Sequence, residues 1–285
     1  SESGNPKSRL NFAQLIAAYF DPHSKILDYE SVYPAGTTRQ QVSDAQLAMM
    51  RNSQTTSQVA ALEYLGWDVP ATITIEGAVE GSNAEGNVEQ GDILRAITTP
   101  DGVRHEITSA ATPFALMRSV PAGSTMTLTV ERSGVMQDIT FDSVAASATE
   151  TGSKLGVYLS ADPVLPVDIT VNIDGVGGPS AGMMFSLSII DRLTPGDMTG
   201  GNVIAGTGTM SYDGQVGAIG GIQQKLWGAH RDGAQWFLAP STNCDEVVGH
   251  VPDGLRVVSV STLDEAVSAV HSIADGTGDA LPTCQ

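Results

Sequence analysis

The 285-residue chain carries 14 basic and 32 acidic side chains, and its formal net charge of -18 argues against nucleic acid or an anionic lipid surface as a partner. With 41% hydrophobic residues and 31 glycines the chain is globular and long enough for two or three domains. No run approaches about 18 consecutive apolar residues, so no membrane span is predicted within these residues.

Helical patterns dominate the first part of the chain. An amphipathic helix is predicted from Leu10 to Phe20, and a longer helix from Arg39 to Leu65, where Gly66 ends it. The apolar positions of the longer helix repeat at helical spacing, a pattern more typical of packing than of a functional surface. We therefore assign both helices to packing.

Alternating apolar residues replace the helical pattern after Gly66. The predicted elements are strands around Ile73 and over Gly91–Ile97, a helix over Thr112–Arg118, and a hairpin pairing Met126–Val130 with Gln137–Phe141 across Ser133-Gly134. This order of elements resembles a PDZ domain of the kind associated with bacterial proteases.

The PDZ resemblance implies a peptide-binding function. In PDZ domains a peptide C-terminus adds as a strand at a sheet edge, and backbone N–H groups of a short loop hold its carboxylate. The resemblance makes Leu65, Gly66 and Trp67 the candidate peptide-binding loop. A simple helix stop followed by a packed tryptophan explains the same three residues equally well.

A serine follows a glycine turn in the next part of the chain. The small-residue segment Val144–Ser153 predicts a linker, and Val171–Gly182 predicts a short strand, a glycine turn and the start of a helix. Ser180 is expected in the first helical turn, where backbone N–H groups lack intrahelical partners. The N–H groups of Gly177, Gly178 or Ser180 are therefore oxyanion-hole candidates. A Gly-rich helix cap with an exposed serine is the alternative for this stretch alone.

A lysine on an apolar stripe follows in a second Gly-rich stretch. Residues 203–230 predict a strand, an Asp-Gly hairpin turn, a second strand, a Gly-Gly break and a helix. On that helix Lys225 shares a face with Ile222, Leu226 and Ala229. Burial lowers the pKa of a lysine from about 10.4 toward neutrality, which makes it a general base able to take a serine proton. A lysine with a buried stem and a solvated head is the alternative.

Together these two stretches resemble the proteolytic domain of the Lon protease family, which uses a Ser-Lys dyad. The shared motifs are Gly178-Pro179-Ser180-Ala181-Gly182, Thr207-Gly208, Gly214-Gln215-Val216, Ile219-Gly220-Gly221 with Lys225, and Ala229-His230-Arg231. The resemblance implies Ser180 as the nucleophile, Lys225 as the base and Thr207 as the hydroxyl that orients the lysine. ATP-dependent relatives carry Asp-Gly directly before the Pro-Ser pair, whereas here Gly177-Gly178 stands there and Asp174 lies further upstream.

The segment Gly178–Gly182 also fits the Gly-x-Ser-x-Gly nucleophile elbow of α/β-hydrolases. That fold needs an acid and then a histidine after the serine, and a Gly-rich oxyanion segment before it. Only His230, His250 and His271 follow Ser180, and no such upstream segment is visible. The Lon resemblance is therefore the better explanation.

Cys244 and Cys284 are the only cysteines, too few for a structural zinc site. A disulfide between them ties down the polar C-terminal tail and implies an oxidising compartment. Two buried free thiols are the alternative. No metal or cofactor is predicted.

The chain is thus predicted as an α+β protein with N-terminal helices (1–63), a PDZ-like β-sandwich or barrel (64–145) and a C-terminal Lon-type proteolytic α/β domain (146–285). This arrangement resembles the bacterial PDZ-Lon proteases, which implies an ATP-independent serine endopeptidase acting on protein or peptide substrates. The resemblance also implies the extracytoplasmic face of the cell membrane, with an N-terminal anchor upstream of Ser1. No Gly-x-x-x-x-Gly-Lys-Ser/Thr phosphate loop occurs in these residues.

Two questions stay open at this stage. Lon-type domains form hexameric rings, so the resemblance implies a homo-oligomer, while a monomer is equally compatible with the residues. The alternative function is a PDZ peptide-binding adaptor whose protease domain is inactive or autoinhibited.

Overall fold

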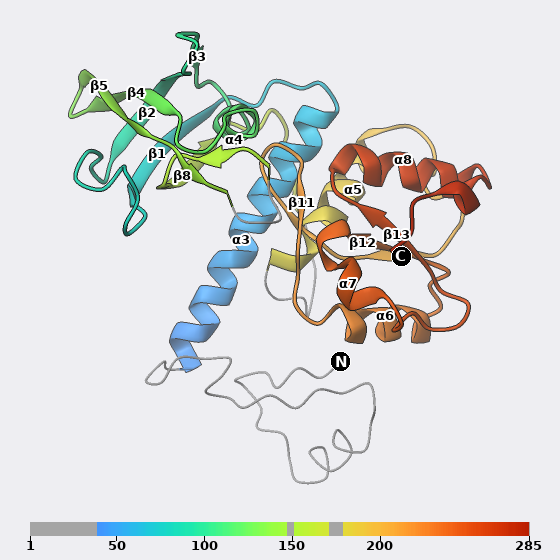
Figure 1. Ribbon diagram of the computed structural model, residues 1–285. Coiled ribbons are helices and arrows are strands. Elements are labelled where there is room, and N and C mark those ends of the chain that lie inside the picture. Colours follow the sequence, from blue (N-terminus) through green and yellow to red (C-terminus); the bar gives the residue numbers. More distant parts are fainter. Residues whose placement is uncertain (1–38, 147–150, 171–178, 285) are drawn as a thin grey trace. The chain divides into compact units, whose positions relative to one another are not determined.

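The computed structural model describes residues 39–146, 151–170 and 179–284, with side chains from residue 49 onward (Figure 1). The predicted helix Leu10–Phe20 lies outside these residues. The contacts of the chain form two compact units: unit 1 comprises Ser1–Ala61, Thr170–Ser211 and Gln215–Gln285, and unit 2 comprises Leu62–Ile169 and Tyr212–Gly214. Unit 1 therefore joins residues of the predicted segment 1–63 to the predicted domain 146–285. The fold is mixed α and β, with an N-terminal helix, an antiparallel sheet and a parallel α/β region.

The N-terminal helix α3 spans Arg39–Tyr64. Gly66 ends it with a left-handed backbone, φ +80°, which glycine adopts without a Cβ clash. The N–H group of Gly66 donates to the Glu63 carbonyl, and that of Trp67 donates to the Leu62 carbonyl. These two bonds satisfy carbonyls that the end of a helix leaves without intrahelical partners.

Unit 2 is built on an antiparallel sheet with the strand order β5-β4-β2-β1-β8, and β3 pairs with β2 (Figure 1). Its main elements are β1 (Ala71–Ala78), β2 (Asp92–Thr98), β3 (Arg104–Glu106), α4 (Thr112–Met117), β4 (Thr125–Arg132), β5 (Val135–Asp142) and β8 (Val157–Pro163). Its core includes large, fully buried side chains from β1, β2 and β4, namely Ile73, Ile75, Leu94, Ile97, Met126 and Leu128.

The β4–β5 hairpin confirms the predicted pairing. Met126 lies opposite Phe141, and Val130 lies opposite Gln137. Ser133 and Gly134 at the turn both have positive φ, 51° and 78°. Two such residues give the turn a twist that matches the twist of the strands it joins.

Strand β8 is not predicted by the sequence pattern. It runs antiparallel to β1, with Ala71 opposite Pro163 and Ala78 opposite Val157. The predicted linker before it contains the short strand β6 (Val144–Ala145), which pairs with β7 (Ser153–Lys154). Strand β1 therefore has a partner on each side, β2 on one and β8 on the other.

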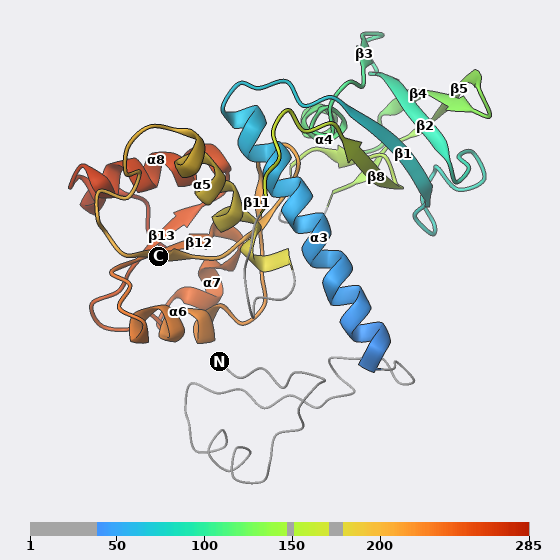
Figure 2. The ribbon, with the colours of Figure 1, turned by 180° about the vertical axis from the view of Figure 1, so that it is seen from behind.

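Unit 1 contains a parallel three-stranded sheet in the order β13-β12-β9. Its main elements after α3 are η1 (Pro179–Ala181), α5 (Gly182–Leu193), β9 (Ile204–Gly206), β10 (Thr209–Met210), β11 (Val216–Gly217), α6 (Ile222–Arg231), β12 (Trp236–Pro240), α7 (Cys244–Val247), β13 (Arg256–Val260) and α8 (Leu263–Ala274). Figure 1 shows α6 and α7 on one side of β12 and β13, with α5 and α8 on the other, and Figure 2 shows the same layers from behind. The central strand β12 is buried along its whole length because helices cover both faces of the sheet.

The predicted strand that begins at Val203 and runs to Met210 is wrong in one respect, because the structure divides it between two sheets. Strand β9 pairs with β12, whereas β10 pairs with β11. The N–H group of Thr207 still donates to the Leu238 carbonyl of β12, but that of Gly208 donates to the Ser180 carbonyl. The chain therefore leaves the parallel sheet at Thr207.

Candidate active site

Ser180 lies in the 3-10 turn η1 directly before α5, and not within the first turn of the α-helix as predicted. Its side chain is half-buried. Its carbonyl oxygen accepts hydrogen bonds from the Gly208 N–H at 2.8 Å and from the Thr207 hydroxyl at 2.9 Å. The segment that follows β9 thus fixes the main chain of the predicted nucleophile.

Helix α6 positions Lys225. The helix begins after Gly221, whose left-handed backbone, φ +71°, turns the chain into it. Ile222 and Leu226 are fully buried in a core that includes residues of β12 and β13. Because Lys225 follows Ile222 by three residues, its side chain starts from the same face of the helix. Its Nζ lies 2.8 Å from Ser180 Oγ.

Thr207 completes this group of polar side chains. It is only 2% exposed, and its Oγ1 lies 2.9 Å from Lys225 Nζ. A hydroxyl has one proton to donate, and that of Thr207 goes to the Ser180 carbonyl. Thr207 Oγ1 therefore accepts from Lys225, which directs one N–H of the amine toward the threonine. In the neutral amine the lone pair is then free to face the Ser180 hydroxyl.

The surroundings of Lys225 favour its neutral form. Burial lowers the pKa of Lys225 from its ordinary value of 10.5, because the charged ammonium loses solvation. A lysine with a lowered pKa at hydrogen-bond distance from a serine hydroxyl is able to remove the serine proton. Seryl nucleophilic attack on a carbonyl is the chemistry that this arrangement supports.

The predicted oxyanion-hole glycines, Gly177 and Gly178, lie outside the described residues, as does Asp174. Of the three oxyanion candidates only Ser180 is described. Within the residues that the structure describes, no group of three or more His, Cys, Asp or Glu side chains is arranged to hold a metal ion.

The predicted peptide-binding loop, Leu65, Gly66 and Trp67, lies at the end of α3. A carboxylate loop needs free N–H groups, but those of Gly66 and Trp67 already donate to carbonyls of α3. Of the two interpretations of Leu65, Gly66 and Trp67, the helix stop is the one that accounts for these bonds. The tryptophan is not closely packed, because 38% of its surface is exposed.

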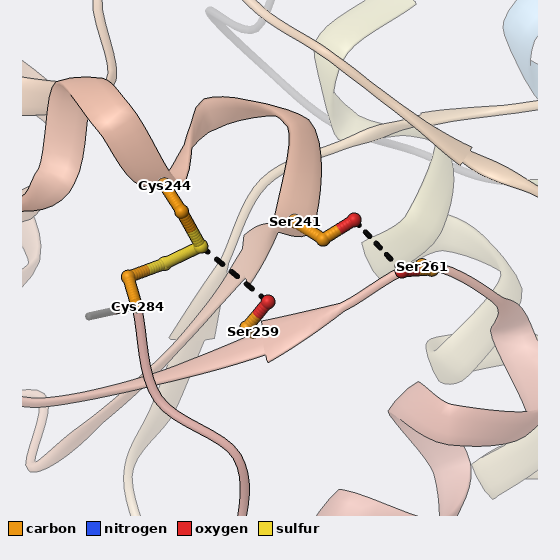
Figure 3. The surroundings of a disulfide bond; sticks show 5 residues. All are labelled: Ser241, Cys244, Ser259, Ser261 and Cys284. Atoms are coloured by element: carbon orange, nitrogen blue, oxygen red, sulfur yellow. Dashed lines mark hydrogen bonds between the residues drawn. A yellow bond between two sulfur atoms is a disulfide. The ribbon is translucent and has the colours of Figure 1, made fainter. Parts of the chain in front are cut away.

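A disulfide joins Cys244 at the start of α7 to Cys284 in the C-terminal tail (Figure 3). The tail lies beside β13, where the Ser259 N–H donates to the Pro282 carbonyl at 2.9 Å. Ser259 Oγ also lies 3.4 Å from Cys244 Sγ (Figure 3). The disulfide therefore anchors a polar tail to the edge of the parallel sheet.

Sequence reasoning did not assign a role to Asn243. This residue is 2% exposed, and its amide exchanges two hydrogen bonds of 2.9 Å with the N–H and C=O groups of Ile219. It thereby fixes the chain just before Gly221, where α6 begins. An isolated asparagine carries no local signal of such a role, because its partner lies 24 residues away.

Comparison with known proteins identifies the family of the chain. The model of the "Lon protease (S16) C-terminal proteolytic domain" matches residues 117–272, more than half of the chain. The chain belongs to the Lon protease family. The Lon-matched segment contains Ser180, Thr207 and Lys225, and it begins at the end of α4, so that α3 lies outside it.

Individual Lon proteases are similar over parts of their length. Lon protease 2 of Herpetosiphon aurantiacus is 31% identical over 153 residues, 52% of this chain and 18% of that protein. Lon protease of Clostridioides difficile is 37% identical over 93 residues, 32% of this chain and 12% of that protein. Lon protease of Haemophilus influenzae is 32% identical over 143 residues, 47% of this chain and 17% of that protein. The chain thus spans less than a fifth of each of these Lon proteases.

Proposed function

We propose that this protein is a serine endopeptidase in which Ser180 is the nucleophile and Lys225 the general base. The observation that carries the proposal is the distance of 2.8 Å between Lys225 Nζ and Ser180 Oγ. Membership of the Lon protease family, with both residues inside the matched segment, supports the same assignment.

The proposed reaction has two halves. Neutral Lys225 takes the Ser180 proton as Oγ attacks the peptide carbonyl, and the resulting ammonium gives a proton to the leaving amine as the C–N bond breaks. A water then attacks the acyl-enzyme ester with Lys225 again accepting a proton, which releases the carboxylic acid and restores the Ser180 hydroxyl. The candidate donors to the oxyanion are the N–H groups of Gly177, Gly178 and Ser180.

Thr207 has an orienting role in this proposal. Since its hydroxyl donates to the Ser180 carbonyl and accepts from Lys225, it links the position of the base to the main chain of the nucleophile. Misplacement of either group weakens proton transfer, because the reacting atoms must lie within about 3 Å of each other.

We further propose that cleavage by these residues needs no ATP hydrolysis and acts on flexible polypeptides. The support is the resemblance of the order of elements, a PDZ-like part followed by a Lon-type part, to the bacterial PDZ-Lon proteases.

The test compares wild type, Ser180→Ala and Lys225→Ala on a fluorescently labelled unfolded protein, with and without ATP. We expect wild type to cleave equally well in both conditions and both variants to be inactive. Circular dichroism checks that the variants are folded. Wild-type activity in either variant contradicts the dyad, whereas activity only in the presence of ATP contradicts the ATP-independent part alone.

Peptide binding by unit 2 is a second proposal. In the alternative function, peptide binding is the only activity, and the protein is an adaptor whose protease domain is inactive or autoinhibited. An antiparallel sheet with a short helix supports the PDZ-like assignment. Because β8 already pairs with β1, a peptide strand that pairs with β1 on this side has to displace β8. Calorimetry with peptides on inactive Ser180→Ala protein tests binding, and an inactive wild type that binds peptide favours the adaptor.

We also propose a location on the extracytoplasmic face of the membrane, with an N-terminal anchor upstream of Ser1. The Cys244–Cys284 disulfide supports an oxidising compartment. In the described part of the chain, no helix combines the length and the apolar character needed to cross a bilayer. Thiol labelling of the protein in intact cells before and after reduction tests the location, and light scattering distinguishes a homo-oligomer from a monomer.

A further inference from the structure

Helix α3 brings buried hydroxyl groups to the segment that carries Ser180. Ser57 is fully buried, and its Oγ lies 2.9 Å from the Gly182 carbonyl and 2.6 Å from the Ser53 carbonyl, so its single proton is shared between two acceptors. One turn earlier, Ser53 Oγ donates to the Pro179 carbonyl at 3.3 Å. Two serines of α3 therefore hold the carbonyls on either side of Ser180.

The same segment is held from the other side. Thr207 and Gly208 donate to the Ser180 carbonyl, and the Met183 N–H donates to the Gly208 carbonyl. A Cβ at Gly182 would lie 2.9 Å from the Met210 main-chain nitrogen and 3.2 Å from Ser53 Oγ. This close approach leaves no room for a side chain, so the turn that carries Ser180 is enclosed between α3 and β10.

We propose that Ser57, assisted by Ser53, is a positioning residue for Ser180, so that α3 belongs to the catalytic apparatus although it lies outside the matched Lon segment. The inference rests on the proposed dyad. Ser57 acts through the main chain of Gly182 and touches no reacting atom. Its hydroxyl sets where η1 lies relative to Lys225, which α6 and the parallel sheet position independently.

A purely structural role for these hydroxyls makes a different prediction. Buried hydroxyls between helices contribute to stability by similar amounts through hydrogen bonding, wherever they lie. Ser186 of α5 provides the matched control. It is also fully buried, and its Oγ donates at 3.1 Å to the carbonyl of Ser57 in α3, so this bond ends on α3 and not on the residues around Ser180. Ser57→Ala and Ser186→Ala each remove one hydrogen bond between α3 and α5, and only the first removes a bond to the Ser180 segment.

The experiment measures kcat, KM and melting temperature of both variants on labelled unfolded protein, together with the rate at which a sulfonyl fluoride labels Ser180. We expect Ser57→Ala to lower kcat and the labelling rate by about tenfold or more with KM unchanged, because small displacements of a nucleophile have large effects on rate. Ser186→Ala should lower the melting temperature to a similar extent and leave kcat within about twofold of wild type. Equal kcat values for the two variants, or a change confined to KM, would overturn the proposal.

Two additions separate the other outcomes. Ser53→Ala removes only the 3.3 Å bond to the Pro179 carbonyl, so it should fold even if Ser57→Ala does not. A lower kcat of Ser53→Ala at unchanged KM supports the proposal. If Ser57→Ala is unfolded, a wild-type kcat in Ser53→Ala overturns the proposal. Ser180→Ala and Lys225→Ala are assayed in parallel. If they are inactive while Ser57→Ala and Ser53→Ala match wild type, the positioning proposal fails alone. If they retain activity, the dyad itself fails.

Discussion

Lys225 Nζ lies 2.8 Å from Ser180 Oγ although the two residues are 45 positions apart in the chain. The serine belongs to a 3-10 turn before α5, and the lysine to a helix on the opposite side of the parallel sheet. The two side chains meet beyond the end of β9, where the chain leaves the sheet at Thr207. The Thr207 hydroxyl bonds there to the Ser180 carbonyl and to Lys225 Nζ. The candidate dyad is therefore assembled at the point where the chain leaves the sheet.

Lys225→Arg should abolish proteolysis although it keeps the positive charge. A guanidinium stays protonated at all accessible pH values and cannot accept the serine proton, so we expect a loss of at least about a hundredfold in kcat. Cleavage of labelled unfolded protein measures the effect. The control is Lys154→Arg, an exposed position in β7 that should keep wild-type activity. An arginine variant at 225 that retains most of its activity rules out lysine as the base.

Lys225→Met should stabilise the protein at neutral pH. Burial lowers the pKa of Lys225 below 10.5, so between the lowered pKa and 10.5 the unfolded chain binds more protons than the folded protein. Stability in the wild type therefore rises with pH across that window and is lost as pH falls through the lowered pKa. The gain from methionine should shrink as the pH approaches about 10.5. Urea denaturation of both proteins over this range measures it, and a gain that does not vary with pH contradicts the lowered pKa.

Thr207→Val should reduce kcat while the protein remains folded. Valine keeps the shape of threonine but neither accepts from Lys225 nor donates to the Ser180 carbonyl, so both dyad residues lose an orienting contact. We expect kcat to fall by about tenfold or more and KM to change little. Steady-state kinetics provide the measurement. Thr207→Ser keeps the hydroxyl and should stay within about threefold of wild type, so equal losses in the two variants would point to packing instead.

Replacing both cysteines with serine should lower the free energy of unfolding by about 4 kcal/mol in the loop-entropy model, because the disulfide closes a loop between residues 40 positions apart. Urea denaturation of oxidised wild type and of the Cys244→Ser, Cys284→Ser double variant measures the difference. Adding a reductant to wild type is the control, and it should bring the two curves together. Identical curves for oxidised and reduced wild type would exclude a stabilising role.

Gly66→Val should destabilise the end of α3. The φ of +80° places Gly66 in the left-handed region, where an L-residue costs about 1–2 kcal/mol. Gly228→Ala is the contrasting variant, because Gly228 lies inside α6 with open space at its Cβ position, and alanine there should stabilise by about 0.5–1 kcal/mol. Thermal denaturation of both variants tests the pair, and changes of the same sign would contradict the conformational argument.

Several elements of the fold could be predicted because their signals are local. The helical spacing of α3, the Ser133-Gly134 turn between β4 and β5, and the Gly220-Gly221 break before α6 each involve residues close in sequence. Strand β8 could not be predicted because its existence depends on pairing with β1, whose residues lie 79 to 92 positions upstream of their partners. For the same reason the break at Thr207 could not be foreseen.

The chemical groups of the site were determined by the sequence alone, since a serine after a glycine turn and a lysine on an apolar helix stripe, in the order of the Lon family, select Ser180, Thr207 and Lys225. Only the tertiary structure decided that Lys225 Nζ lies within 3 Å of both Ser180 Oγ and Thr207 Oγ1, and that α3 contacts the segment around Ser180. Hydrogen bonds act over about 3 Å and desolvation depends on everything packed around a group, so both arise only when segments distant in sequence are brought together.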